Sequence, residues 1–206
     1  MLITVEGLDG AGKTTLVTGL ARALPVTVLR EPGGVEVSER IRALLADPAL
    51  EVDPRAEALL FAAARAQLVA SRLRPLLEAG SSVLLDRFVD SSLAYQGGGR
   101  GLGIEWVRAL NRFATGGLAP DLTFLLRISP EDGLARISGR DFDRLEGAGE
   151  AFFTAVAEAY DSLAEAEPDR FVVLDALEPP EALLAVALEA VSARSGGGGP
   201  GERLAG

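Results

Sequence analysis

The stretch LITVEGLDGAGKTT (residues 2–15) decides the fold, because a short apolar run leads through a glycine-rich turn to the only lysine of the chain. The run at 2–6 predicts a buried strand, and the leucine spacing in KTTLVTGLARAL (13–24) predicts a helix. Arginine supplies the other 19 of the 20 basic residues. Lys13 therefore marks a position that needs a compact charge on a flexible stem rather than a planar fork.

The turn between this strand and this helix matches the phosphate-binding pattern G-x-x-x-x-G-K-[ST] in full. Its glycines let successive main-chain N–H groups face one anion, and the N-terminus of the helix adds positive potential. Lys13 would reach the β- and γ-phosphates, and the Thr14 hydroxyl would ligate Mg²⁺. The alternative is a glycine-rich turn that binds nothing. The pattern predicts a nucleoside triphosphate site formed by Gly7, Leu8, Asp9, Gly10, Ala11, Gly12, Lys13, Thr14 and Thr15.

Strands and helices alternate along the rest of the chain. Further strands are predicted at 26–30, 82–86, 122–128 and 171–175, and helices at 36–46, 53–79, 104–115, 130–138, 148–166 and 180–193. The longest helix is expected to begin at an Asp53 cap followed by proline, with Pro75 as a candidate kink. This alternation indicates an α/β fold with a mainly parallel sheet.

Composition excludes several classes of protein. With no cysteine and no histidine, the chain has no disulfide, thiolate metal site, His-ligated zinc or histidine-based triad. The net charge of −10 argues against nucleic acid as a partner. No signal peptide or long apolar span is recognisable, so we expect a cytoplasmic protein without a membrane partner. One domain is expected over residues 1–195, followed by a disordered glycine-rich tail at 196–206.

Two pairs of residues indicate a second binding site beside the phosphate loop. Asp86 and Arg87 end the strand at 82–86, at the edge of the sheet where open α/β folds bind ligands. Asp86 could hold Mg²⁺, its water or an acceptor oxygen, and the alternative is an ion pair that caps the strand. Phe61 and Arg65 are spaced i, i+4 on one helix face, which suits stacking on a flat base. The alternative is a core phenylalanine beside an arginine that snorkels to solvent.

Two further segments are less specific. AYQGGGRG (94–101) places an aromatic ring, an amide and an arginine on a glycine-rich turn, and a flexible loop is the simplest interpretation. ARISGRDFDRLE (135–146) repeats arginine every four residues, at Arg136, Arg140 and Arg144. Mobile arginines suit phosphoryl transfer because they neutralise charge and exclude water. A solvated, charged helix is the alternative for this segment.

These features narrow the functional class to a small kinase. GTP-binding switches need an Asn-Lys-x-Asp motif, which is impossible when the one lysine lies in the phosphate loop. Three alternatives stay open. They are a kinase for another small acceptor, a nucleotide-binding regulator that has lost turnover, and a nucleic-acid-binding ATPase, which the charge disfavours.

An ordered series of motifs resembles the thymidylate kinase family over about residues 1–195: IT-VEGLDGAGKTT, LREPGG, LLFAAARAQ, LLDRFVDSSLAYQGGGRGLG, PDLTFLL and RDFDRLE. The resemblance implies a P-loop nucleoside-monophosphate-kinase-like fold, with a five-stranded parallel sheet flanked by helices. It also implies a short mobile lid at about 136–147 and a homodimer packed through helices. The implied reaction is direct in-line phosphoryl transfer from MgATP to dTMP, which gives dTDP for dTTP biosynthesis.

The resemblance also implies roles for individual residues. Asp9 would position the acceptor sugar, Phe61 would stack on thymine, and Arg65 would read its edge. Arg87 would hold the acceptor phosphate, with Asp86 and Thr14 near the metal. The remaining contacts to dTMP would come from Arg30 on the phosphate side, Ser92 and Gln96 at the base, and Tyr95 at the sugar 2′-position.

The catalytic arginine is expected on the lid, because Gly10 occupies the loop position that carries an arginine in some relatives. The chain therefore resembles the bacterial lid-arginine type. The candidate catalytic residues are Lys13, Asp9, Asp86, Arg87, Arg136 and Arg140. Val35 is a departure, since many bacterial relatives have a small hydroxyl residue after EPGG.

Overall fold

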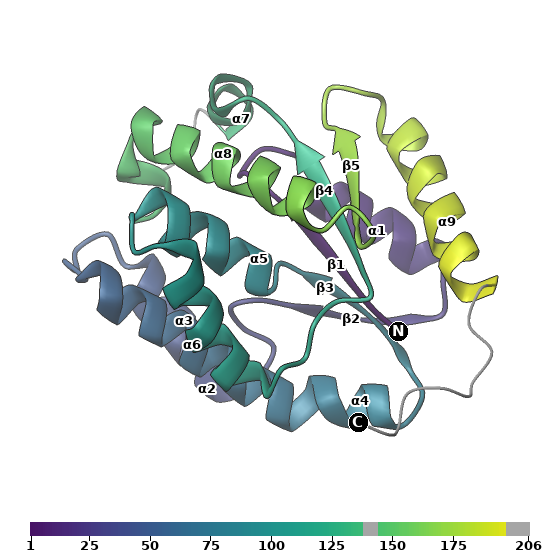
Figure 1. The fold of residues 1–206 in the computed structure, drawn as a ribbon, viewed down its shortest axis with the longest axis horizontal. Coiled ribbons are helices and arrows are strands. Elements are labelled where there is room, and N and C mark those ends of the chain that lie inside the picture. The colour runs from purple at the N-terminus through teal and green to yellow at the C-terminus, as the bar shows by residue number, and fades with distance from the viewer. Residues whose placement is uncertain (138–143, 197–206) are drawn as a thin grey trace.

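The computed structural model describes residues 1–137 and 144–196, and its strands form one parallel sheet (Figure 1). The order is β2-β3-β1-β4-β5, so β1 lies at the centre between β3 and β4. The strands are β1 (Leu2–Gly7), β2 (Val26–Arg30), β3 (Ser82–Asp86), β4 (Leu122–Arg127) and β5 (Phe171–Asp175). The predicted five-stranded parallel sheet flanked by helices is confirmed.

Helical segments connect the strands and cover both faces of the sheet (Figure 1). The helices are α1 (Lys13–Ala23), α2 (Glu36–Ala46), α3 (Pro54–Leu68), α4 (Arg74–Glu78), α5 (Val89–Ser92), α6 (Ile104–Thr115), α7 (Pro130–Ile137), α8 (Glu150–Ala166) and α9 (Pro180–Gly196). Two π-helical turns, η1 (Val69–Leu73) and η2 (Leu93–Gly99), and one 3₁₀ turn, η3 (Glu146–Ala148), complete the described elements. Helix α9 runs through Gly196, the first residue of the predicted tail.

The two faces of the sheet are buried by different helices. Ile3 and Val5 belong to the same apolar cluster as Leu20 of α1, and α9 packs beside α1. On the opposite face, Leu2 clusters with Leu73 of η1 and Leu85 of β3. Helix α8 lies over β4 and β5 on that second face (Figure 1). Because both faces are covered, the middle strands β1, β3 and β4 are buried along most of their length, as is usual for parallel sheets.

The predicted helix at 53–79 is wrong in one respect, because a π-helical turn divides it. Asp53 caps α3 as predicted, and its side chain accepts a hydrogen bond from the Arg55 N–H. The π turn η1 comes immediately before α4, whose second residue is Pro75. Proline lacks an N–H, and its ring clashes with the carbonyl four residues earlier, so a regular α-helix cannot continue there. The wider turn accommodates the proline and keeps the helical path.

The interpretation of 94–101 as a flexible loop is also wrong. Residues 93–99 form the π turn η2, which continues α5 and is largely buried against α8 and α6. Its glycines serve close packing: a Cβ on Gly98 would lie 2.6 Å from the Ala159 Cβ, and one on Gly99 would lie 2.6 Å from the Phe152 ring. The glycine run therefore reflects helix contact rather than freedom of the chain.

Parts of two predictions lie outside the described residues. Arg140 and half of the predicted lid fall in 138–143, and the predicted tail falls in 197–206 after Gly196. The expectation that residues 1–195 form a single domain stays a prediction. Within residues 1–137 and 144–196, no helix has the length and apolar character that crossing a membrane requires.

Candidate active site

The phosphate-binding loop joins the end of β1 to the start of α1. Gly12 adopts a left-handed conformation (φ 93°) directly before α1, and Gly10 also has a positive φ (82°). A Cβ on Gly7 would lie 2.5 Å from the Leu126 carbonyl oxygen, so the loop also approaches β4 closely. These conformations favour glycine and turn the loop around the N-terminus of α1, where main-chain N–H groups are free to bind an anion.

Lys13 is the first residue of α1, and its ammonium group lies inside the loop. Nζ donates to the carbonyl oxygens of Gly7 (3.1 Å) and Leu8 (2.7 Å), and it lies 3.6 Å from Asp9 Oδ1. Burial, with the nearby charge of Arg87, lowers the pKa of Lys13 to about 8. The loop thus holds a cation that is only partly satisfied by its carboxylate neighbour and is ready to pair with a further anion.

Arg87 follows β3 and has a strained backbone, with φ 66°; no other described non-glycine residue has a positive φ. Its Nη2 donates to Asp9 Oδ1 (2.5 Å), and its Nη1 donates to the Gly7 carbonyl (3.1 Å). Burial alone would raise the pKa of Asp9, but the charges of Arg87 and Lys13 hold that pKa well below its usual range. Arg87 therefore pairs with Asp9, and the alternative of a strand-capping pair between Asp86 and Arg87 is not what the structure contains.

Two cavities meet at this ion pair. The first, here called the inner cavity, has a volume of about 310 Å³ and is lined by Phe61, Ser92 and Tyr95 among others. The second, here called the loop cavity, has a volume of about 570 Å³ and includes Thr14 and Asp86 in its lining. Both are lined by Asp9, Glu31, Arg42 and Arg87. A ligand in each cavity would thus face the other across the Asp9–Arg87 pair.

Arg65 lies in the wall of the inner cavity and is only 2% exposed, so the alternative of a snorkelling arginine is wrong. Its Nε donates to Glu31 Oε2 (2.6 Å), and its Nη2 donates to the Phe88 carbonyl (2.9 Å). Its Nη1 donates to Ser92 Oγ (2.9 Å) and to the Asn111 side-chain oxygen. The guanidinium is therefore fixed in one orientation beside Phe61.

The aromatic and amide residues of η2 have different positions. The Tyr95 hydroxyl donates to Asp9 Oδ2 (3.1 Å), and its ring lies 5.2 Å from the Arg87 guanidinium, which it helps to orient. Gln96 is buried, and its Nε2 donates to Glu57 Oε1 (2.9 Å). Gln96 is not among the residues that line the inner cavity, so the structure does not bring it together with Phe61 and Ser92.

The predicted arginines around the lid lie in different places. Arg136 lines the loop cavity, where Nη2 donates to the Ala176 carbonyl (3.0 Å) and Nη1 to the Gly10 carbonyl (3.4 Å). Arg144 lies instead beside α3: it donates to Glu57 Oε2 (2.7 Å) and to the Leu45 carbonyl (3.0 Å). Arg140 lies outside the described residues.

Of the remaining residues singled out in the sequence, only Arg30 lines the loop cavity. Arg30 pairs with Glu39 (2.8 Å). Thr15 is exposed on the first turn of α1, and Val35 caps α2 without a side-chain hydrogen bond. Leu8 and Ala11 are buried within the loop, so they would contribute their main chain rather than their side chains.

Comparison with known proteins settles the family. The thymidylate kinase family model matches residues 5–185. The chain belongs to the thymidylate kinase family. It is 49% identical to the thymidylate kinase of Deinococcus radiodurans, over 94% of this chain and 97% of that protein. It is 46% identical to the thymidylate kinase of Chlorobium chlorochromatii, over 89% and 90% of the two chains. The crystal structure of thymidylate kinase from Ehrlichia chaffeensis superposes with a TM-score of 0.78 at 28% identity, covering 93% and 98%.

The structure adds two residues to the inner cavity and its wall that the sequence did not predict. Glu31 is buried in the wall of the inner cavity and pairs with Arg65, and its second oxygen, Oε1, has no hydrogen-bond partner among the residues that the structure describes. Burial raises the pKa of Glu31 despite the Arg65 charge. Asn111, on α6, orients the same guanidinium. The position of Glu31 after β2 was a usable signal, because the carboxyl ends of parallel strands share one edge of the sheet.

The residues of the loop cavity fit a magnesium–nucleotide complex. The exposed Thr14 hydroxyl and the Asp86 carboxylate line the same cavity as Lys13, and hard oxygen donors of this kind suit Mg²⁺. Lys13, Arg87 and Arg136 supply positive charge around the same space. A polyphosphate anion with its divalent cation matches this donor set.

Proposed function

We propose that this chain, as a member of the thymidylate kinase family, phosphorylates dTMP to dTDP with MgATP as the phosphoryl donor. The family relationship supports dTMP phosphorylation in nucleotide biosynthesis. We further propose that ATP is the phosphoryl donor, that Mg²⁺ is the metal, and that individual residues bind the two substrates. That the enzyme works in the cytoplasm stays a prediction from the sequence.

The observation that carries the proposal is the meeting of the two cavities at Asp9 and Arg87. A phosphoryl group can pass directly between two substrates only when donor and acceptor oxygens lie in line and close together. A nucleotide in the loop cavity and a monophosphate in the inner cavity would both place phosphates beside Arg87. This arrangement supports direct transfer without a covalent enzyme intermediate.

The donor side of the proposal rests on the loop. The N–H groups around Gly10 and Gly12 would bind the β-phosphate, and Lys13 would leave its carbonyl partners to pair with the β- and γ-phosphates. Thr14 and Asp86 would hold Mg²⁺, which neutralises charge between the phosphates when bound. Of the two lid arginines that the structure describes, Arg136 is the better placed for the transferring group, because it lines the loop cavity and Arg144 pairs with Glu57 instead.

The acceptor side rests on the inner cavity. Phe61 would stack on the base, and the fixed Arg65 guanidinium would read its edge beside Ser92. Asp9 and Tyr95, which are hydrogen-bonded to each other, would contact the sugar, and Arg87 would hold the acceptor phosphate. The phosphate oxygen is already ionised near neutral pH, so no strong general base is needed.

The test is a coupled assay of ADP release with MgATP and each of dTMP, dUMP, dCMP, dGMP and dAMP. We expect strong turnover with dTMP, weaker turnover with dUMP and almost none with the others. Strong turnover with a different acceptor would retain the kinase and overturn the base-reading site. Tight ATP binding without turnover on any acceptor would favour a regulator.

A matched pair of variants tests the acceptor phosphate site. Arg87 follows β3, and Arg127 ends β4 in an exposed pair with Asp161. Arg87→Gln should raise the KM for dTMP about 10- to 100-fold, the loss expected for a charged hydrogen bond. Arg127→Gln, which removes a similar charge from the same sheet, should leave both KM values near wild type. Equal effects of the two variants would contradict the role of Arg87.

We also propose a homodimer packed through α6 and neighbouring helices. Trp106 and Phe113 are spaced i, i+7 on α6 and are 80% and 90% exposed, and Leu59 on α3 is 57% exposed. Leu59 and Trp106 line one groove together with Leu102 and Leu110. Large apolar side chains gathered on one face are typical of protein–protein contacts, and a second copy is the partner that the family resemblance implies.

A further inference from the structure

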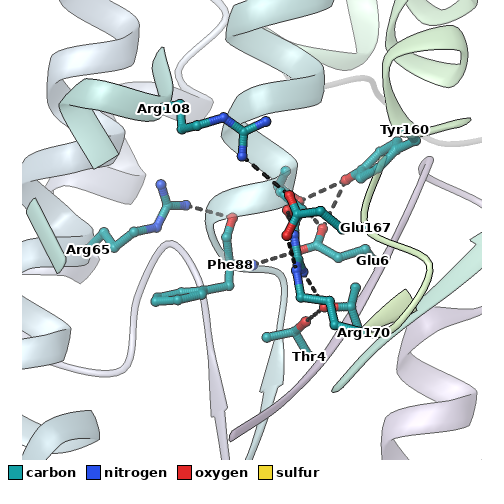
Figure 2. A network of polar contacts seen from close by, with 11 residues as sticks. Thr4, Glu6, Arg65, Phe88, Arg108, Tyr160, Glu167 and Arg170 are labelled. Atoms are coloured by element: carbon teal, nitrogen blue, oxygen red, sulfur yellow. Dashed lines mark hydrogen bonds and ion pairs between the residues drawn. The ribbon is translucent and has the colours of Figure 1, made fainter. Parts of the chain in front are cut away.

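A buried carboxylate lies directly behind Arg87. Glu6, on β1 just before the loop, is 0% exposed and accepts three hydrogen bonds. Figure 2 shows Glu6 between Phe88 and Tyr160, which donate two of them. Its Oε1 accepts from the Phe88 N–H (2.7 Å), and its Oε2 accepts from Ser91 Oγ (2.6 Å) and the Tyr160 hydroxyl (2.9 Å). Within residues 1–137 and 144–196, Glu6 forms no ion pair within 4 Å. A buried carboxylate held by neutral donors is costly, so its presence calls for a physical reason.

Two of the three donors to Glu6 also act on Arg87. Phe88 is the next residue along the chain, so its bond to Glu6 fixes the main chain where Arg87 adopts its positive φ. Such a conformation costs about 1–3 kcal/mol and persists only when the surroundings determine it. Ser91 Oγ, while it donates to Glu6, accepts from Arg87 Nη1 (3.2 Å). Glu6 therefore acts on both the backbone and the guanidinium of Arg87.

We propose that Glu6 is a positioning residue, which holds Arg87 in the orientation that the acceptor phosphate requires through the Phe88 N–H and the Ser91 hydroxyl. The inference rests on the proposed function, because it takes Arg87 as the group that binds the acceptor phosphate. Asp9 accepts a hydrogen bond from the guanidinium directly, whereas Glu6 acts on the guanidinium through the Ser91 hydroxyl. Removal of the negative charge at Glu6 leaves the hydrogen bond to Asp9 intact and weakens the restraint that acts through Ser91 and Phe88.

The charge of Glu6 depends on pH near neutrality. Burial, together with the charge of Asp90, raises the pKa of Glu6 to about 7. Arg170 donates to both oxygens of Asp90 (2.7 and 2.8 Å), which limits the effect of Asp90. In register on β4, the neighbour of Glu6 is the uncharged Leu125. The charged or titratable groups that act on Glu6 from the surrounding elements are Asp90 on α5, Arg87 after β3, Lys13 on α1 and Tyr160 on α8.

Glu6→Gln tests the proposal, because the amide keeps the shape of the side chain and removes its charge. At pH 8 we expect the variant to lose about 10- to 100-fold in kcat/KM for dTMP, the scale of a small misplacement of a binding group. The KM for ATP should stay near wild type, because Lys13 and the loop amides are not held by Glu6 in this structure.

The ratio of wild-type to Glu6→Gln kcat/KM for dTMP should change with pH. Below about pH 6 wild-type Glu6 is protonated and resembles the amide, so the ratio approaches one; above about pH 8 it is charged and the ratio is largest. The phosphate of dTMP titrates near pH 6 as well, but its effect cancels because both enzymes use the same substrate. A ratio that is constant with pH, or that falls as pH rises, would overturn the inference.

Two further variants keep the test decisive. Thr4→Val removes a buried hydrogen bond to Thr123 (2.8 Å) on the same face of β1, so it should lower stability without the selective loss for dTMP.

If Glu6→Gln does not fold, Tyr160→Phe replaces it as the test variant. The variant deletes one donor to the charged carboxylate, so it should raise the pKa of Glu6 and move the acid limb of the dTMP profile to higher pH. An unmoved limb would contradict the proposal. Absence of turnover in the wild-type enzyme would instead refute the proposed function itself, and the inference with it.

Discussion

Lys13 occupies the one position where this arginine-rich sequence uses lysine, and its surroundings give the reason. Its Nζ lies between the carbonyl oxygens of Gly7 and Leu8, in a side chain that is almost fully buried. A planar guanidinium has no room for its fork there, so Lys13→Arg should lower kcat by about 10²- to 10³-fold, as removal of one preorganised donor does. Single-turnover kinetics with MgATP and dTMP measure the loss, and thermal melting controls for folding. Near-normal turnover would show that the position needs only a positive charge.

The same lysine predicts an alkaline limit to ATP use. In the free protein its pKa is lowered to about 8, chiefly by burial. As the pH rises through that value Lys13 loses its proton, so kcat/KM for ATP should fall, because this parameter reports groups in the free enzyme. Bound phosphates favour the charged form, so the limb in kcat should lie at higher pH. The absence of histidine and cysteine removes most competing groups, and N-terminal acetylation removes the α-amino group. A profile that stays flat up to pH 9.5 would contradict this assignment.

The role of a site residue could be predicted only where it depends on residues that are close to it in the sequence. The loop can be recognised in the sequence because its pattern lies within nine consecutive residues, and its binding role stays a prediction. The i, i+4 spacing of Phe61 and Arg65 predicts a shared face, but not that Arg65 is buried. Its burial depends on Glu31, 34 residues away, and on Asn111, 46 residues away, and no local pattern reports such partners.

At the scale of elements, the spacing of apolar residues predicted the ends of the strands and long helices to within about three residues. It did not predict the two π-helical turns. Both π turns lie at sequences that normally argue against a helix: η1 precedes Pro75, and η2 contains three glycines. In η2 the glycines are required by the surfaces of α6 and α8, which are distant in sequence. Tertiary packing therefore overrides the local propensity of this segment.

The packing of η2 against α8 makes Gly98 a sensitive position. A Cβ there would lie 2.6 Å from the Ala159 Cβ and 3.1 Å from the Ala155 carbonyl oxygen. Gly98→Ala should destabilise the fold by about 1–3 kcal/mol, the usual cost of overpacking. Because Tyr95 belongs to the same turn, the KM for dTMP should rise as well. Urea denaturation measures the first effect.

Controls for Gly98→Ala come from the same chain. Ala159→Gly removes the opposing methyl group, so the double variant should recover part of the lost stability. Gly147→Ala adds a methyl group where, apart from the chain neighbours, no atom of the described residues lies within 4 Å, and it should cost little. Equal losses in Gly98→Ala and Gly147→Ala would show that contact with α8 is not the cause.

At the scale of the whole molecule, the strand order explains why separate motifs form one site. The order β2-β3-β1-β4-β5 places the carboxyl ends of β2, β3 and β1 side by side, so Glu31, Arg87 and the loop converge. The alternation of strands and helices predicts a parallel sheet but leaves the strand order open. The location of the site could therefore be predicted from the rule that ligands bind at this edge of the sheet. Which residues of neighbouring strands lie side by side in the site could not be predicted, because that depends on the strand order.

The assembly of the molecule is tested best through Trp106, the only tryptophan of the chain. If the α6 face binds a second copy, Trp106 moves from an 80% exposed position into an apolar interface, so its fluorescence emission should shift to the red when the protein is diluted. Trp106→Arg should give a monomer by light scattering, because an unpaired charge at the centre of an interface is costly. Leu177→Arg, at a 60% exposed position between β5 and α9, should remain a dimer. A wild-type monomer at high concentration, or dimers of the Trp106 variant, would exclude this face as the interface.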